Sequence, residues 1–158
     1  MRSLSAALLF ALVLPVFAAD LPEPVPVQAA PAVDRLSAAR GHIAAQRWPQ
    51  AVAELKRLDD RRNADWNNLM GYALRKQRPP DLDGAQRYYD DALRIAPMHR
   101  GALEYAGELA LMKGDLTTAQ RHLAALVQAC GAACEEHADL QRAIERYKAA
   151  GGRFVTTP

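Results

Sequence analysis

The chain has 158 residues, a formal net charge of +2, and basic and acidic side chains interleaved along its length. This nearly neutral balance excludes the strongly basic surface that nucleic-acid binding requires, and it gives no indication of a charged membrane-binding surface. Half of the residues (50%) are hydrophobic, alanine and leucine abound, and β-branched residues are sparse. The composition therefore favours an all-α protein.

Residues 1–18 predict a signal peptide rather than part of the fold. Arg2 gives a short positive start, Ala6–Leu14 is an unbroken apolar run, and Val16-Phe17-Ala18 places a small residue at the cleavage point. The apolar run is too short for a comfortable transmembrane helix; an uncleaved helix is the alternative. We therefore expect a protein exported to the periplasm of a Gram-negative-type bacterium, or secreted.

The next segment, 19–31, contains four prolines and no helical period. It predicts an extended, Pro-rich leader that acts as a spacer. From Ala32 the apolar residues fall into helical spacing and keep it to Ala150. The folded part of the chain is therefore expected at 32–150.

The strongest pattern lies between Trp66 and Pro97. Its signature residues are Gly71, Ala85, Tyr89, Ala92 and Pro97, the last four in the order A-x3-Y-x2-A-x4-P. Gly71 and Ala85 are small where two helices would touch, and Tyr89 would fill the groove beside that contact. This spacing resembles a tetratricopeptide (TPR) repeat, in which a helix, a turn and an antiparallel helix recur about every 34 residues.

The same spacing occurs on both sides of the central copy. Gly107 and Ala119 repeat it downstream with a turn at Gly114-Asp115, and Ala39 and Ala51 repeat it upstream. In the central copy the two small residues lie further apart, which predicts a longer turn at Gln77–Asp83. The predicted segments are repeats at about 32–63, 64–99 and 100–131, a capping helix at 134–150 and a flexible tail at 151–158.

Three further segments resemble a group of small exported bacterial TPR proteins: NLMGYALRK (68–76), HRGALEYAGELAL (99–111) and CGAACEEHADL (130–140). The resemblance implies a right-handed α-solenoid of about three TPR-like helical hairpins with a C-terminal capping helix. It also implies a role in protein–protein contact, with no reaction attached. The predicted function is an adaptor or assembly factor whose partner is an envelope protein or peptide.

In a TPR array the first helix of each hairpin lines the concave side. The predicted protein-binding groove is Asn68, Tyr72, Arg75, Lys76, Glu104, Glu108, Leu111 and Met112, with Leu36 and Arg40 as further candidates. An amide, an aromatic ring, two bases and two acids around an apolar patch suit a peptide or protein surface. They do not form a consistently basic clamp for a C-terminal carboxylate. The alternative for Leu111 and Met112 is packing against the last helix.

The two cysteines, Cys130 and Cys134, stand between the last repeat and the capping helix. An even cysteine count in an exported chain predicts a disulfide, here one that pins the last helix. One alternative is a small metal-handling protein that binds copper or zinc through Cys130, Cys134 and His137, with His122 as a candidate fourth ligand. Another is a redox-active pair, because Cys134 lies at a helix N-terminus.

No catalytic constellation is found in the sequence. Its serines, Ser3, Ser5 and Ser37, have no His/Asp context, no glycine-rich phosphate loop is present, and the histidines are dispersed. The sequence therefore predicts a protein that is not an enzyme and needs no cofactor.

Overall fold

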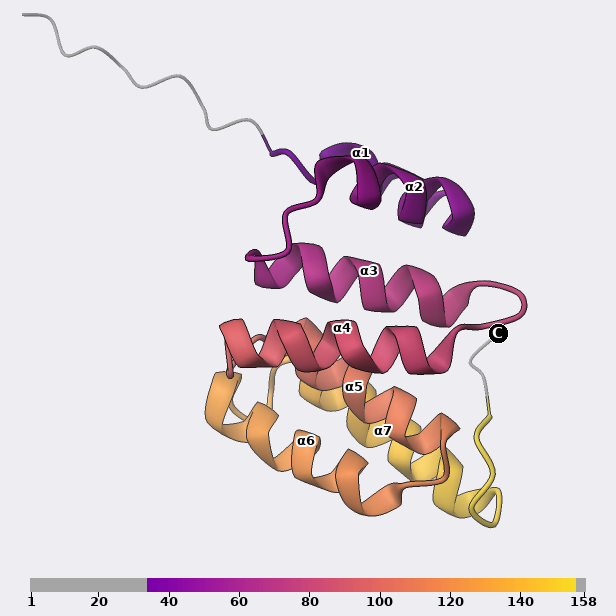
Figure 1. Ribbon diagram of the computed structural model, residues 1–158. Coiled ribbons are helices and arrows are strands. Elements are labelled where there is room, and N and C mark those ends of the chain that lie inside the picture. Colours follow the sequence, from indigo (N-terminus) through magenta and orange to yellow (C-terminus); the bar gives the residue numbers. More distant parts are fainter. Residues whose placement is uncertain (1–33, 156–158) are drawn as a thin grey trace, which may run out of the picture. The chain divides into compact units, whose positions relative to one another are not determined.

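The computed structural model describes residues 34–155, which form seven α-helices and no strands (Figure 1). The helices are α1 (Ser37–Ala44), α2 (Trp48–Leu58), α3 (Ala64–Lys76), α4 (Leu82–Ile95), α5 (Arg100–Met112), α6 (Leu116–Cys130) and α7 (Glu135–Ala149). The prediction of an all-α fold is confirmed for this part of the chain. The predicted signal peptide (1–18), the leader (19–31) and the end of the predicted tail (156–158) lie outside the described residues.

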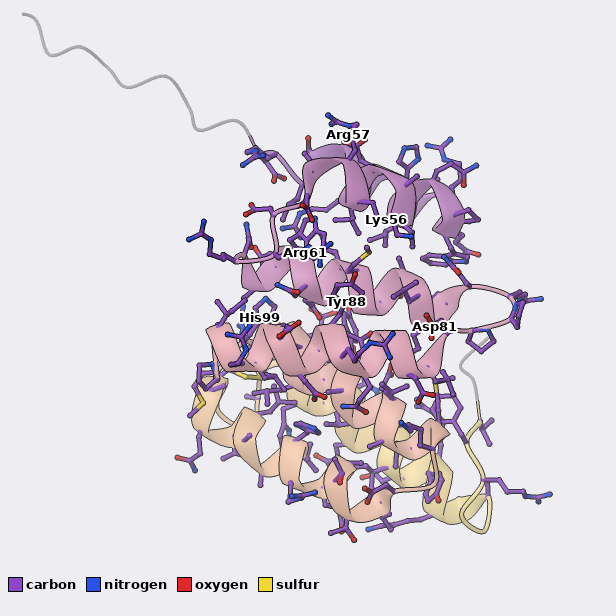
Figure 2. The ribbon with its side chains drawn as sticks, in the orientation of Figure 1. Lys56, Arg57, Arg61, Asp81, Tyr88 and His99 are labelled. Carbon is purple, nitrogen blue, oxygen red and sulfur yellow. A yellow bond between two sulfur atoms is a disulfide. The ribbon has the colours of Figure 1, made fainter. Side chains whose placement is uncertain are left out.

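Side-chain caps fix where four of the helices begin. The cap atoms that accept a backbone N–H are Asn63 Oδ1 for α3, Asp81 Oδ1 for α4, His99 Nδ1 for α5 and Asp115 Oδ1 for α6. Figure 2 labels Asp81 and His99 at the starts of their helices. Such a cap is typically worth about 1 kcal/mol because it satisfies an otherwise unpaired donor. Because Asp81 caps α4, that helix begins inside the turn predicted at Gln77–Asp83.

Helices that follow one another in sequence pack together in space. α1 packs on α2, α3 on α4 and α5 on α6, while contacts of α2 with α3 and of α4 with α5 join these pairs (Figure 1). α7 packs against both α5 and α6. Gly114 adopts a φ of 81° between α5 and α6, the left-handed conformation that its predicted turn requires. The turn prediction at Gly114 is therefore confirmed.

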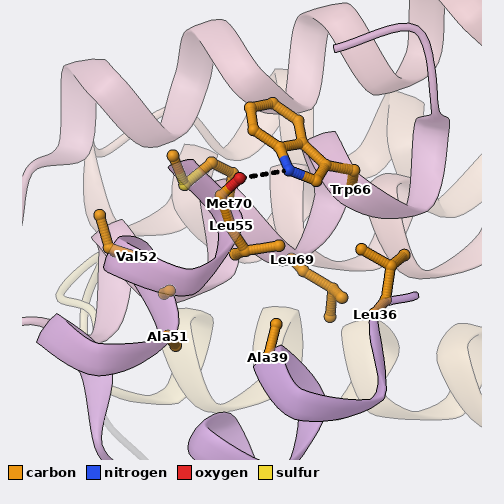
Figure 3. Close-up of a cluster of buried hydrophobic side chains, with 9 residues drawn as sticks. Leu36, Ala39, Ala51, Val52, Leu55, Trp66, Leu69 and Met70 are labelled. Atoms are coloured by element: carbon orange, nitrogen blue, oxygen red, sulfur yellow. Dashed lines mark hydrogen bonds between the residues drawn. The ribbon is translucent and has the colours of Figure 1, made fainter. Parts of the chain in front are cut away.

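The first core cluster joins α1, α2 and α3 (Figure 3). Its members are Leu36, Ala39, Ala51, Val52, Leu55, Trp66, Leu69, Met70 and Ala73. Trp66 is 1% exposed, and its Nε1 donates a hydrogen bond of 2.8 Å to the carbonyl oxygen of Leu55. The buried Asn67 amide donates to the carbonyl oxygens of Arg61 and Asn63, both at 2.8 Å. The side-chain N–H groups of Trp66 and Asn67 therefore have hydrogen-bond partners although they are buried.

The small residues of the repeat pattern lie at two different helix contacts. A Cβ on Gly71 of α3 would lie 2.7 Å from the ring of Tyr89 on α4, and Ala85 is fully buried. A Cβ on Gly107 of α5 would instead meet a methyl carbon of Leu140 on α7 at 2.5 Å. Gly71 therefore serves the contact that the sequence predicts, whereas Gly107 makes room for the last helix.

The end of the described chain is held to the helices in two ways. A disulfide joins Cys130, the last residue of α6, to Cys134, which precedes α7, and so confirms the predicted pairing. After α7, Phe154 packs against the second core cluster. This cluster consists of Leu103, Ala110, Leu111, Ala119, Leu126, Leu140, Ala143, Ile144 and Tyr147. None of the helices in 34–155 has the length and apolarity needed to cross a membrane.

Candidate functional site

Two neighbouring pockets share Tyr72. The acidic pocket, of about 340 Å³, is lined by Arg40, Ile43, Asn68, Leu69, Tyr72, Gly101, Glu104, Tyr105, Glu135, Glu136 and Asp139. The basic pocket, of about 640 Å³, is lined by Gln46, Trp48, Tyr72, Arg75, Lys76, Gln77, Arg78, Pro80, Glu108, Met112, Arg146, Phe154 and Val155. Apart from Trp48, the helical lining comes from α1, α3, α5 and α7. Within residues 34–155, α4 and α6 contribute nothing to either pocket.

Aromatic rings form the wall between α3 and α5. The ring centroids of Tyr72 and Tyr105 lie 4.6 Å apart, and Trp48 meets Tyr72 edge-on at 5.9 Å. The Arg75 guanidinium carbon lies 5.5 Å from the Tyr72 ring centroid and 5.4 Å from that of Tyr105. Lys76 Nζ is 5.5 Å from the Tyr72 centroid. These distances allow cation–π attraction, so the rings and the two cations hold one another in place.

Arg75 is an interior cation. It is only 4% exposed, and its Nη1 lies 2.6 Å from Glu108 Oε2 on α5. Burial raises the pKa of the nearby Tyr89 phenol, against the lowering effect of the Arg75 charge. The two phenols beside Arg75, Tyr72 and Tyr105, have pKa values raised by burial in the same way. These tyrosines are therefore neutral, and Glu108 is the counter-ion of Arg75.

Glu104 is an interior acid without such a counter-ion. It is 8% exposed, and among the described residues its side chain makes no hydrogen bond or ion pair. Burial, followed by repulsion from Glu108 and Asp139, raises the pKa of Glu104 to about 8, while the Arg75 charge opposes this shift. Since an unpaired carboxylate is costly to bury, Glu104 carries a proton through the neutral pH range.

The structure brings together most of the predicted groove residues. All but Leu111 line one of the two pockets: Asn68, Tyr72, Arg75, Lys76, Glu104, Glu108 and Met112. Leu111 lies in the second core cluster, where it packs with the last helix, and Leu36 lies in the first core cluster. Arg40 lines the acidic pocket. The main difference is depth, because Asn68, Arg75 and Glu104 are buried rather than spread on an open surface.

Several lining residues were missed from the sequence. Among them are Trp48, Tyr105, Glu135, Glu136, Asp139 and Arg146. Tyr105 follows Glu104 directly, and an aromatic residue beside a predicted groove position could have drawn attention to it. The α7 residues gave no such signal. Their acids suit the start of a helix and their bases its end, so their pattern is explained by the helix dipole alone.

The cysteine pair does not form the predicted alternative metal set. Both sulfur atoms are bonded to one another, so neither is available as a thiolate in this structure. The carboxylate near the two sulfur atoms belongs to Glu136, with the three candidate ligand atoms within 4.8 Å of one another. His137 is buried and outside this group, and His122 lies on α6 with a pKa lowered by burial.

A third pocket, of about 310 Å³, lies between α2, α3 and α4 and is lined by Lys56, Asp59, Arg61, Trp66, Met70 and Tyr88. Figure 2 labels Lys56, Arg61 and Tyr88 at this place. Arg61 is already paired with Asp59 at 2.7 Å, and Trp66 belongs to the first core cluster. This pocket therefore offers fewer unpaired groups than the other two.

Comparison with known proteins adds no family assignment: no family model matches the sequence, and no curated protein is significantly similar to it.

Proposed function

We propose that this protein is a non-enzymatic adaptor or assembly factor of the TPR type, which binds another protein or a peptide through the face that carries the acidic and basic pockets. The proposal rests on which helices supply the residues that line the two pockets. α1, α3, α5 and α7 supply nearly all of the helical residues of both pockets, whereas α4 and α6 supply none within 34–155. A binding face lined by alternate helices is what a row of helical hairpins would present.

We also infer that α1–α2, α3–α4 and α5–α6 are three TPR-like hairpins of a right-handed solenoid, with α7 as its cap. The pairing of consecutive helices and the close approach of Gly71 to Tyr89 support this arrangement. The fit is weaker at Gly107, which approaches α7 instead of α6. In this arrangement α7 covers the apolar surface that the last hairpin would otherwise expose.

Export to the periplasm remains part of the proposal. The apolar run Ala6–Leu14 and the small residue at Ala18 support a signal peptide. The disulfide between Cys130 and Cys134 fits an oxidising compartment, where such bonds persist. The disulfide also favours the adaptor over the metal-handling alternative, since it occupies both sulfur atoms.

The chemistry of the face suits a polypeptide ligand. Tyrosine and tryptophan rings are frequent anchors of protein interfaces, and here Trp48, Tyr72 and Tyr105 form one connected group. Acidic groups gather at one side of Tyr72 and basic groups at the other. A bound segment would therefore be oriented by its own charges.

Site-specific photo-crosslinking in the native host tests this function. A benzophenone side chain at Lys76, which is exposed and lines the basic pocket, should crosslink a specific polypeptide. The same group at Gln120, exposed on α6 and outside both pockets, is the matched control. Crosslinks from position 76 alone support the proposed binding face. Equal products from both positions, or none from position 76, would contradict it.

A further inference from the structure

The acidic pocket contains buried acceptors that have no donor. Glu104 on α5 and Asn68 on α3 are each 8% exposed, and both line this pocket. Asn68 Oδ1 has no hydrogen-bond partner, and Glu104 has none among the described residues. Buried polar atoms in folded proteins are nearly always paired, so the unpaired Asn68 Oδ1, in a pocket that also holds the Glu104 carboxyl group, indicates a missing donor.

The cations near the pocket are engaged elsewhere. Arg75 forms its ion pair with Glu108 through Nη1, while its Nε and Nη2 have no hydrogen-bond partner in the described chain. Arg40 lies 3.6 Å from Asp34 and 3.4 Å from Asp65. On the α7 side, Glu136 pairs with Arg100 at 3.4 Å, and Asp139 pairs with Arg142. The groups that line the pocket with Glu104 or act on its charge are Asn68, Tyr72 and Arg75 from α3, Tyr105 and Glu108 from α5, Glu135, Glu136 and Asp139 from α7, and Arg40 from α1. Both cations in this set, Arg75 and Arg40, are paired with acids other than Glu104.

The spacing of these acids suits an organic cation better than a bare metal ion. In the part of the chain that the structure describes, the group of ligand atoms close enough to share one ion is that of Cys130, Cys134 and Glu136. Glu104 and Asp139 belong to no such group of three or more ligand residues within 34–155. A metal ion needs oxygen ligands at about 2–2.6 Å on several sides. A cationic side chain, by contrast, reaches separated acceptors through several N–H donors.

We propose that the acidic pocket receives the side chain of a lysine or arginine of the partner polypeptide, whose N–H groups donate to the Glu104 carboxylate and to Asn68 Oδ1. The rings of Tyr72 and Tyr105 would flank the alkyl stem and the cation. This inference rests on the proposed function, because it names the group of the partner that the face recognises.

Binding of such a cation is coupled to proton release from Glu104. The free carboxyl group is protonated at neutral pH, because its pKa is about 8, and a positive side chain favours the ionised form. The lysine ammonium, with a pKa near 10.4, stays charged over the same range. The affinity for the cation should therefore rise as the pH rises toward 8 and level off above it.

The test is a set of NMR titrations of the ¹⁵N-labelled protein with its disulfide intact. The probes are N-acetyl-lysine methylamide, N-acetyl-arginine methylamide and, as the uncharged control, N-acetyl-norleucine methylamide. The two cationic probes should shift the amides of residues that line the acidic pocket, and the norleucine probe should not. Their association constants should rise roughly tenfold per pH unit from about pH 6 to about pH 8.

Glu104→Gln keeps the side-chain size and removes the charge, so it should abolish the pH dependence and most of the binding. Glu145→Gln on the exposed side of α7 is the matched control and should bind like the wild type. The inference is overturned if norleucine shifts the same amides equally, or if Glu104→Gln binds as tightly as the wild type. It is also overturned if calcium or spermidine occupies the pocket more tightly than either amino-acid probe.

The two proposals fail separately. If position 76 still crosslinks its partner equally well in the Glu104→Gln variant and the cationic probes do not bind, the cation site is wrong and the binding face stands. If the cationic probes bind through Glu104 and no polypeptide is crosslinked from position 76, the adaptor function is wrong. That second outcome also overturns the assignment of the cation to a polypeptide side chain.

Discussion

Two buried regions of this protein treat their polar groups differently. In the first core cluster, Trp66 Nε1 and the Asn67 amide donate to backbone carbonyls at 2.8 Å. Between α3 and α5, Arg75 has a single ion pair and Glu104 has no partner in the described chain. The first region is complete in itself and serves the fold. The second leaves the Glu104 carboxyl group and the Nε and Nη2 of Arg75 without hydrogen-bond partners beside the two pockets, where a ligand could supply them.

The largest expected effect comes from reversing the buried charge. Arg75→Glu should lower the free energy of unfolding by about 3–5 kcal/mol, because it leaves Glu108 without its counter-ion beside a second buried acid. Urea denaturation monitored by circular dichroism measures this change. Lys76→Glu reverses the neighbouring charge at an exposed position and should change stability by less than about 1 kcal/mol.

This pair of variants also separates folding from binding. Lys76→Glu should weaken crosslinking to the partner although the protein stays folded. The sequence predicts both cations on the groove surface, where charge reversal at either would spare the fold. Equal stabilities of the two variants would show that Arg75 is not an interior cation, and the contrast between the two buried regions would fail.

Helices and turns could be predicted from the sequence more easily than the burial of individual side chains. Caps such as Asp81 and Asp115 and the glycine at position 114 act locally, so their roles can be predicted from a few neighbouring residues. Arg75 and Lys76 are adjacent and chemically alike, yet one turns inward beside Tyr105 and the other lies exposed. A helix rotates by about 100° per residue, so a small error in the assigned face exchanges their roles.

The contacts of α7 with earlier helices could not be predicted from the sequence either. Leu140 approaches Gly107, and Glu136 and Asp139 line the acidic pocket, because α7 packs against α5 as well as α6. The amphipathic pattern of a last helix shows that it has an apolar face, but not which earlier helices it covers. The burial of Glu104 follows from that packing and was therefore missed.

The second prediction concerns the close contact between α3 and α4. Gly71→Leu should cost about 3 kcal/mol, since even its Cβ would lie 2.7 Å from the buried ring of Tyr89. Gly41→Ala on α1 is the matched control, because a Cβ there meets nothing within 4 Å. It should stabilise the protein by about 0.5–1 kcal/mol through higher helix propensity. If Gly71→Leu melts with the wild type, the assumed packing of α3 against α4 is wrong.

The third prediction concerns the disulfide, which lies in neither of the two compared regions. Replacing Cys130 and Cys134 together by alanine should cost about 2 kcal/mol, as expected for the loss of so short a closed loop. Thermal unfolding of oxidised wild type and of the double variant measures the difference. Crosslinking from position 76 should persist in the double variant. Loss of function with an unchanged fold would favour the metal-handling alternative.

The last expected effect is spread over several pH units: it is a pH dependence of stability that the region between α3 and α5 should show and the first core cluster should not. The pKa of Glu104 is about 8 in the folded protein against a model-compound value of 4.5, so the folded state binds the extra proton between these values. Stability contributed at this site is therefore greatest at low pH and falls as the pH rises toward 8. The slope attributable to Glu104 should be at most about 1.4 kcal/mol per pH unit.

Urea denaturation of wild type and Glu104→Gln at several pH values in this window isolates that slope, because other titrating groups are common to both proteins. The difference in unfolding free energy should move in favour of Glu104→Gln as the pH rises. Trp66→Phe removes no titratable group from the first core cluster, so its cost should be nearly the same at every pH. A flat difference for Glu104→Gln would mean that its carboxylate is already compensated, and the unpaired carboxyl group that distinguishes this region from the first core cluster would not exist.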